Sequence, residues 1–260
     1  MNKPIIFLLP FLLSFGLVNS QTPANIIVTN PEADNILSGN YNPTNYAASA
    51  VINDHNEIIC GVKSEISTDS LHSYLVKMST FHNRNTGSDT VSATTGIGAA
   101  RRWAYEKFRE LSAVNENRLI TSYLQFDQDI CLMLQHRNIF TVLPGTDTAD
   151  KSVIIIEGHI DSRCEDGCDI TCKAHGMEDN GSGSALVLEL ARVMGKYCLK
   201  HSIVFMLTIG EEQGLWGANA FAQYAQDNGI AIRAVQNNDI VGGILCGNTS
   251  SHPLARMKVT

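Results

Sequence analysis

Histidine and acidic residues follow apolar runs at four separate places in this chain. They lie in the segments GHIDS (158–162), EDNGSG (178–183), EEQGLWGA (211–218) and NNDIVG (237–242). The residues there that could do chemistry are His159, Asp161, Asp179, Glu211, Glu212 and Asp239. One imidazole among several carboxylates is a ligand set that suits zinc, and carboxylates also admit manganese. The four segments together predict a metal site rich in carboxylates.

The first segment pairs a histidine with an aspartate two residues later. In an extended chain, positions i and i+2 point to the same side, so Asp161 could hold the ring of His159 from behind. A carboxylate in that place fixes the tautomer of a ligating histidine and makes it more basic. The alternative is a polar turn after a strand, in which His159 is only hydrogen-bonded.

Glu211 and Glu212 are adjacent carboxylates that follow the apolar run Ile203–Ile209. They would repel each other unless positive charge lies beside them. Neighbouring side chains of an extended chain diverge, so one could bind metal while the other acts as a general base. The alternative is an acidic helix start, where the helix dipole stabilises both charges.

Asp179 and Asp239 are weaker signals when each is taken alone. Asp179 could belong to an ordinary N-cap region, and Asp239 to a solvated turn. Four such segments in order at strand ends nevertheless favour a common site. A carboxylate that bridges two metals would hold them roughly 3.5–4 Å apart, as in aminopeptidases.

The elements that must position these residues alternate between strand and helix. Val153–Ile156 and Ile203–Ile209 are continuous apolar runs typical of strands buried on both faces. Ser184–Tyr197 lies between them with helical periodicity. This alternation predicts an α/β fold, a three-layer sandwich with a mostly parallel central sheet flanked by helices. Ligands of such sheets bind at the carboxyl ends of the strands, which is where these residues fall.

Other elements follow from the same periodicities. Further strands are expected at 119–126, 131–136, 138–143 and 234–240, and further helices after Ser70 and at 99–111 and 215–224. Residues 21–65 are rich in Asn, Thr, Ser and Pro, and we expect them to form an irregular lead-in. The remaining residues, 66–260, are expected to form one domain.

The N-terminus has the pattern of a secretory signal. Lys3 precedes the apolar stretch Ile5–Val18, and small residues end at Ser20, so residues 1–20 are predicted to be removed on export. The expected location is secreted or periplasmic, without a membrane span after cleavage, because the stretch is shorter than the ~20 residues a span needs. The net charge of -7 is spread along the chain and argues against a nucleic-acid partner.

Seven cysteines follow this signal, three of them as C-x3-C-x3-C at 164, 168 and 172. An exported protein permits disulfides, so a disulfide that pins this loop is the favoured interpretation. A structural zinc knot is the alternative. The pairing does not follow from the sequence, and an odd number leaves at least one thiol unpaired within the chain.

The motifs GHIDS, MEDNGSG, EEQGLWGA and NNDIVG, taken together, resemble the co-catalytic two-zinc exopeptidases, family twenty-eight of the metallopeptidases. The resemblance is strong over about 136–246 and weak from about 68. It implies that His159 and Asp239 bind one zinc and Glu212 the other. Asp179 would bridge the two ions, ahead of a cis peptide bond to Asn180.

The resemblance also implies roles in catalysis. Glu211 would be the general base for a water activated by the metals, and Asp161 would orient His159. The implied activity is release of the N-terminal residue of peptides by an aminopeptidase. A carboxypeptidase of the same fold and a non-catalytic protein are the alternatives, and a glutaminyl cyclase is disfavoured by the intact Glu211-Glu212 pair.

This sequence departs from the family pattern in three places. Glu178 stands where Asp is usual, and Ala174-His175-Gly176 stands where Ala-Pro-Gly is common, with His175 expected to be a loop residue. The family's second histidine ligand would follow Asp239 by many tens of residues, and His252 has the wrong spacing for it. The expectation is therefore a chain that lacks the last sheet elements and the last zinc ligand.

Overall fold

The computed structural model describes residues 22–242. The predicted signal, Cys246 and His252 lie outside the described residues. In chain order the elements are β1 (Ala24–Val28), α1 (Pro31–Leu37), the 3-10 helix η1 (Pro43–Tyr46), α2 (His55–Glu65), α3 (Thr68–Ser79), α4 (Gly96–Val114), β2 (Ile120–Ile130), β3 (Met133–Leu143), β4 (Val153–His159), the π-helical η2 (Met177–Ser182), α5 (Gly183–Met194), β5 (Ser202–Thr208), α6 (Trp216–Asp227) and β6 (Ile232–Asn237).

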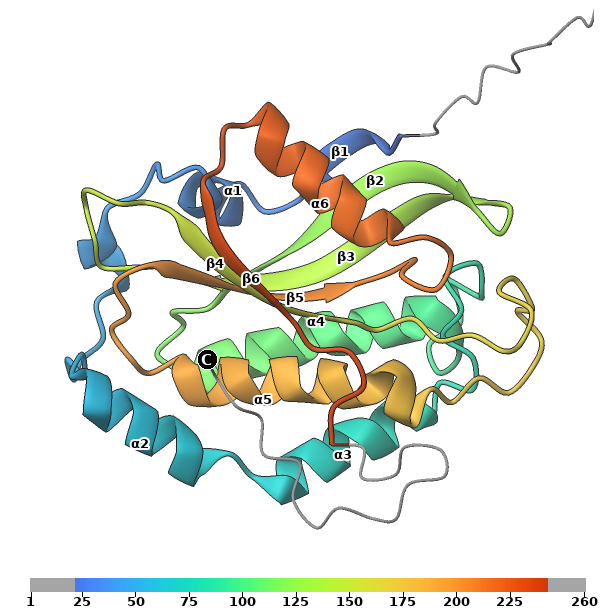
Figure 1. The fold of residues 1–260 in the computed structure, drawn as a ribbon, viewed down its shortest axis with the longest axis horizontal. Coiled ribbons are helices and arrows are strands. Elements are labelled where there is room, and N and C mark those ends of the chain that lie inside the picture. Colours follow the sequence, from blue (N-terminus) through green and yellow to red (C-terminus); the bar gives the residue numbers. More distant parts are fainter. Residues whose placement is uncertain (1–21, 243–260) are drawn as a thin grey trace, which may run out of the picture.

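The strands form one sheet in the order β1-β2-β3-β5-β4-β6. Neighbouring strands are parallel at β5-β4 and β4-β6 and antiparallel at the other three junctions. Consequently β2, β4, β5 and β6 run in one direction, and β1 and β3 run in the other. Helices cover both faces, with α4 and α5 on one and α1 and α6 on the other (Figure 1). This confirms the α/β fold of helix layers around a mostly, though not wholly, parallel sheet.

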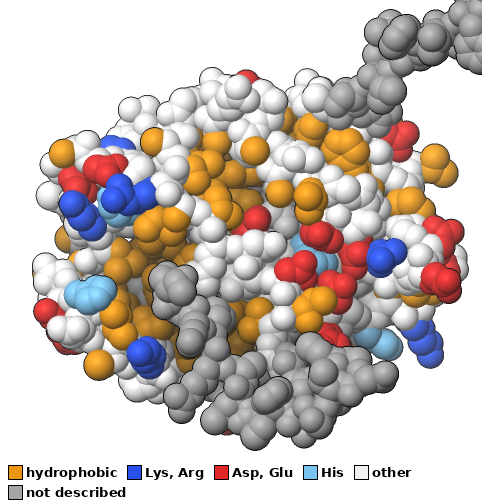
Figure 2. All heavy atoms as spheres, in the orientation of Figure 1, with side chains coloured by type: hydrophobic (Ala, Val, Ile, Leu, Met, Phe, Trp, Pro, Cys, Tyr) orange, Lys and Arg blue, Asp and Glu red, His pale blue; other side chains and the backbone are white. Residues whose placement is uncertain are grey.

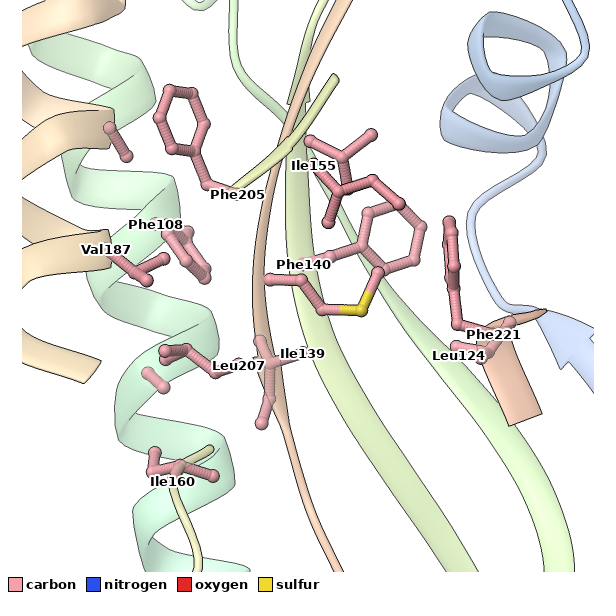
Figure 3. Packing of buried hydrophobic residues seen from close by; sticks show 14 of the residues in the cluster. Phe108, Leu124, Ile139, Phe140, Ile155, Ile160, Val187, Phe205, Leu207 and Phe221 are labelled. Atoms are coloured by element: carbon pink, nitrogen blue, oxygen red, sulfur yellow. The ribbon is translucent and has the colours of Figure 1, made fainter. Parts of the chain in front are cut away.

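The core fills both faces of the central strands. Every residue of β5 is buried, as its apolar sequence predicts. Phe205 and Leu207 point toward α4 and α5, where Phe108 and Val187 lie (Figure 3). The opposite face of the sheet packs Phe140, Ile155 and Leu124 against Phe221 of α6 (Figure 3). The two strands that carry the first and third motifs are thus held by packing on both sides.

The expectation of an irregular lead-in is wrong for its described part. Residues 24–65 form an edge strand and three short helices. Asn30 accepts a hydrogen bond from Glu32 N at the start of α1, and Asn42 accepts one from Thr44 N at the start of η1. The Asn-Pro pairs that suggested irregular chain are therefore helix caps followed by a proline in the first turn.

Two other boundaries also differ from expectation. The two strands predicted at 131–136 and 138–143 are one strand, β3, which pairs with β2 through a turn at Ile130↔Met133. Polar residues interrupted the apolar run of β3 because its first part carries exposed side chains. Ser67, rather than Ser70, caps α3. Among residues 22–242, no helix combines the length and the apolar character that a membrane span requires.

His136 of β3 is a buried imidazole that offers a test of the fold. Its Nε2 lies 2.9 Å from the carbonyl oxygens of Gln128 and Met133, and burial lowers its pKa below the ordinary 6.5. The unfolded chain therefore takes up this proton at a higher pH than the folded chain does. The contribution of His136 to the stability of the fold is present above pH 6.5 and is lost as the pH falls below that value.

We therefore expect the free energy of unfolding to fall between pH 7.5 and pH 5, by at most about 1.4 kcal/mol per pH unit from this residue. Chemical denaturation at each pH gives the free energy of unfolding of the wild type and of His136→Phe. The contribution of His136 is the difference between the two proteins in how steeply this free energy changes with pH. The same pH slope in both proteins would contradict the prediction.

Candidate metal centre

The six predicted residues lie where β4, β5 and β6 end at the same edge of the sheet. His159 is the last residue of β4, Glu211 and Glu212 follow β5, and Asp239 follows β6. Asp179 comes from η2, the turn that opens α5. Figure 2 shows acidic side chains gathered around a histidine on this face of the molecule. The structure therefore brings these side chains to the carboxyl ends of parallel strands, as the topology predicts.

His159 is the centre of this group. Its Nε2 lies 3.1 Å from Oδ1 of Asp179, 3.6 Å from Oδ1 of Asp239 and 3.8 Å from Oε2 of Glu211. This nitrogen is buried, and although Asp179 lies within reach, their contact is not aligned as a hydrogen bond, so Nε2 has no hydrogen-bond partner within the described residues. His159, Asp179 and Asp239 each offer one possible ligand atom, and these three atoms lie within 4.8 Å of one another. A lone ring nitrogen that faces two carboxylates is a ligand set that fits zinc.

Asp161 is fully buried between His159 and the Glu211-Glu212 backbone. Its Oδ1 lies 3.5 Å from Nδ1 of His159, and its own carbonyl oxygen is closer to that nitrogen, at 3.2 Å. The two carboxylate oxygens also accept long hydrogen bonds from the amides of Glu211 (3.4 Å) and Glu212 (3.3 Å). Asp161 thus faces the ring of His159 as predicted, and it joins that ring to the next motif.

Burial and crowding of charge perturb the acid–base properties of this group. Burial lowers the pKa of His159, but the surrounding Asp161, Glu211 and Asp179 outweigh it and raise that pKa to about 9. Burial is the main cause that raises the pKa of Glu211, and the charges of Asp161, Asp239 and Asp179 add to it. The clustered carboxylates therefore favour positive charge at this place.

Glu212 lies outside this cluster. Its Oε2 forms an ion pair with Nε of Arg163 at 2.6 Å. This arginine was not singled out by the sequence analysis. The pKa of Glu212 is raised by burial and by the charges of Asp179 and Asp161, and Arg163 opposes that shift. That Glu212 binds a second zinc stays a prediction, and such binding would have to displace the guanidinium.

The turn that carries Asp179 is fixed by close backbone packing. The peptide bond from Asp179 to Asn180 is cis, as the family resemblance implied. Asn180 is buried; its Nδ2 donates to the carbonyl of Asn238 (2.8 Å) and its Oδ1 accepts from Gly183 N (2.9 Å). A Cβ on Gly183 would lie 1.9 Å from the Asn238 carbonyl oxygen. The loops that carry Asp179 and Asp239 therefore touch through backbone where only glycine fits.

Arg84 is a further residue of the site that sequence reasoning missed. Its side chain is fully buried, and its Nε donates to the carbonyl of Ile160 (2.7 Å). Its two terminal nitrogens donate to the carbonyls of Met78 (3.1 Å), His175 (2.6 Å) and Gly176 (2.9 Å). The loops after β4 and before η2 are thus tied to one guanidinium. Its local sequence, HNRNTG, gives no sign that this arginine is buried.

Two disulfides brace the loop between the first two motifs. They join Cys131 to Cys168 and Cys164 to Cys172, which confirms the disulfide interpretation of the cysteine cluster and rules out the zinc knot. Among the described cysteines, Cys60 and Cys198 are free. His175 is an exposed loop residue whose Nδ1 lies 2.8 Å from the carbonyl of Ser79, so it takes no part in the cluster.

With this geometry in place, comparison with known proteins identifies the domain. Residues 138–244 match the profile of Peptidase family M28. The resemblance inferred from the four motifs is therefore confirmed, and all four lie within the M28 match.

Curated relatives and a solved structure agree with the M28 match. A probable zinc metalloprotease of Phaeosphaeria nodorum is 32% identical over 76% of this chain and 43% of its own length. A probable leucine aminopeptidase of Arthroderma otae is 29% identical over 74% of the chain and 49% of its own length. The structure of LapA from Legionella is similar with a TM-score of 0.58 and 26% identity, over 75% of this chain and 49% of that one. The chain spans about half the length of the curated relatives it matches.

We expect Arg84→Met to lower the free energy of unfolding by at least about 3 kcal/mol, because the substitution removes a buried charged donor that ties four carbonyls from separate loops. Arg84→Lys has fewer donors in a different geometry, so its free energy of unfolding should lie between that of Arg84→Met and that of the wild type. Chemical denaturation measures the change. The matched control is Arg109→Met, which removes an exposed arginine paired with Glu106. If Arg84→Met lowers the free energy of unfolding no more than Arg109→Met does, the proposed role of Arg84 in holding the loops together is contradicted.

Proposed function

We propose that this domain is a zinc-dependent aminopeptidase that releases N-terminal residues from peptides. The observation that carries the proposal is the buried Nε2 of His159, which has no hydrogen-bond partner in the described chain and faces Asp179 and Asp239. The M28 match and the names of the relatives, zinc metalloprotease and leucine aminopeptidase, support the same activity. Export to the periplasm or the medium, inferred from residues 1–20, is part of the proposal.

His159, Asp179 and Asp239 would hold the zinc ion. When bound, zinc polarises a peptide carbonyl and makes a water molecule more acidic. Asp161 contacts Nδ1 of His159 and so leaves Nε2 free to bind the ion. The proposed second ion would add Glu212 as a ligand, with Asp179 as the bridge.

Glu211 is placed to move the proton that hydrolysis requires. Its carboxylate is partly exposed, with Oε2 3.8 Å from Nε2 of His159, so it borders the metal ligands. In the proposed reaction Glu211 takes a proton from the attacking water as the oxygen–carbon bond forms. It then gives that proton to the leaving amine as the carbon–nitrogen bond breaks.

The activity is tested with a leucyl peptide that has a free N-terminus, its N-acetylated copy, and a chelator-treated control. Chelator-sensitive release of leucine from the free peptide alone is the expected result. Release of the C-terminal residue from the acetylated peptide would show a carboxypeptidase instead. Mass spectrometry and calorimetric titration measure how many zinc ions the protein binds. This number separates an inactive metal-binding domain from one that binds no zinc. If the protein takes up no zinc, the proposed metal centre is overturned.

Glu211→Gln should lower the rate of release by about 10²–10⁴-fold, because it removes the proton carrier. The number of zinc ions bound should not change, since Glu211 is not among the proposed ligands. Glu178→Gln, an exposed neighbour of Asp179, is the matched control and should keep both the rate and the zinc. Parallel steady-state assays and zinc titrations make the comparison. A Glu211→Gln enzyme that keeps the wild-type rate would rule out this role.

A further inference from the structure

A second group of charged residues lies apart from the metal centre, between α4 and the β2-β3 hairpin. Arg101 and Arg102 of α4 and Arg137 of β3 line a hollow of about 340 Å³ together with Tyr123. Among residues 22–242, no acidic side chain lines this hollow. We call it the arginine hollow. Three positive charges around one cavity, in a chain of net charge -7, call for a physical explanation.

Arg101 is the most unusual of the three. Its side chain is buried, with 8% of the residue exposed, and its Nη1 has no hydrogen-bond partner in the described chain. Burial, followed by the neighbouring charge of Arg137, lowers its pKa to about 10. By contrast the buried Arg118 donates to the carbonyls of Gly195 and Tyr197. A buried guanidinium without a counter-ion is costly, so a ligand that supplies negative charge would relieve that cost.

The other two arginines are held in place by neutral acceptors, which leaves their charges uncompensated. Arg137 donates to Oε1 of Gln125 (3.0 Å) and lies over the ring of Tyr123. Arg102 donates to the carbonyl of Thr90 (2.8 Å) and to that of Ser92. Within residues 22–242, the arginines that form ion pairs with carboxylates are Arg109, Arg163, Arg192 and Arg233.

One carboxylate, Asp89, lies near the rim of this group. Its Oδ1 accepts the backbone amides of Val91 (2.6 Å) and Ser92 (3.0 Å), and these bonds are the main cause of its lowered pKa, with Arg102 a minor one. Asp89 therefore caps its own loop and forms no ion pair with the three arginines. The positive charge of the hollow stays open to a ligand.

We propose that the arginine hollow binds a tetrahedral oxyanion, a phosphate or sulfate group, between Arg101, Arg102 and Arg137. Guanidinium groups pair with such oxygens through two parallel hydrogen bonds, and three of them more than balance the charge of a divalent anion. The bound anion would join α4 to β3, and its charge would compensate that of the buried Arg101. This site is independent of the proposed peptidase activity.

The test is a titration of chelator-treated protein with inorganic phosphate at constant ionic strength, so that no metal is present to bind the anion. Calorimetry and the thermal midpoint should show saturable binding at one site and a rising midpoint. Sulfate should bind in the same way, and acetate more weakly. Binding of phosphoserine as well would assign the site to phosphate esters, and binding of the free anions alone would assign it to the inorganic ions. No saturable binding of phosphate or sulfate would overturn the proposal.

Two variants and one control locate the binding. Arg137→Gln, at an exposed position, should weaken phosphate binding about tenfold, as expected for the loss of one charged hydrogen-bond donor. Arg101→Met should keep or raise the midpoint without phosphate and lose most of the rise that phosphate causes. Arg109→Gln, on the same helix but paired with Glu106, should bind like the wild type. Equal phosphate binding by the wild type and both hollow variants would place the anion elsewhere and contradict the proposal.

Discussion

The metal centre depends on one buried guanidinium. Arg84 carries a full charge into the interior without a carboxylate partner at ion-pair distance in the described chain, and it is satisfied by the carbonyls of Ile160, Met78, His175 and Gly176. Its pKa is lowered to about 10 by burial, and the nearby charge of Asp161 opposes that shift. The loops that it ties cannot separate without breaking hydrogen bonds to the buried guanidinium and leaving that charge unsatisfied. Asp161 and Asp179 owe their positions to that constraint.

A second constraint is the repulsion among the acidic side chains. Glu211, Asp179 and Asp239 surround one imidazole, and Glu212 adds a further carboxylate beside them. Burial is the main cause that raises the pKa values of Glu211 and Glu212, and the charges of the neighbouring acidic side chains add to it. Among residues 22–242, the guanidinium that pairs with one of these carboxylates is that of Arg163, which contacts Glu212. Divalent metal is the cation that would satisfy the whole set, which is why this group is better explained as a metal centre than as a solvated polar turn.

The parts of this arrangement that follow from short-range pattern could be predicted from the sequence. Continuous apolar runs identified β4 and β5, and the rule for parallel sheets placed His159 and Glu211 at one edge. Arg84, Arg163 and the helix caps at Asn30 and Asn42 could not be found in this way. Each owes its role to a partner distant in sequence or to a backbone conformation, and their residue types are equally common in exposed loops. The disulfide pairing did not follow from the sequence for the same reason, because Cys131 and Cys168 are 37 residues apart in the chain.

The ligands of the proposed zinc ion are supported unequally by the fold. His159 is the last residue of β4, which has a neighbouring strand on each side, whereas Asp239 follows β6, an edge strand in which every residue is exposed. Little apolar burial therefore holds β6 in place. Asn238 compensates, because its amide and its Nδ2 both donate to the carbonyl of Glu157 (2.9 and 3.0 Å), and its own carbonyl accepts from Asn180. The amides of Ile240 and Val241 also donate to side chains of η2. The position of Asp239 is thus set by polar bonds to β4 and η2, so binding of metal and attachment of β6 to the sheet should stabilise each other.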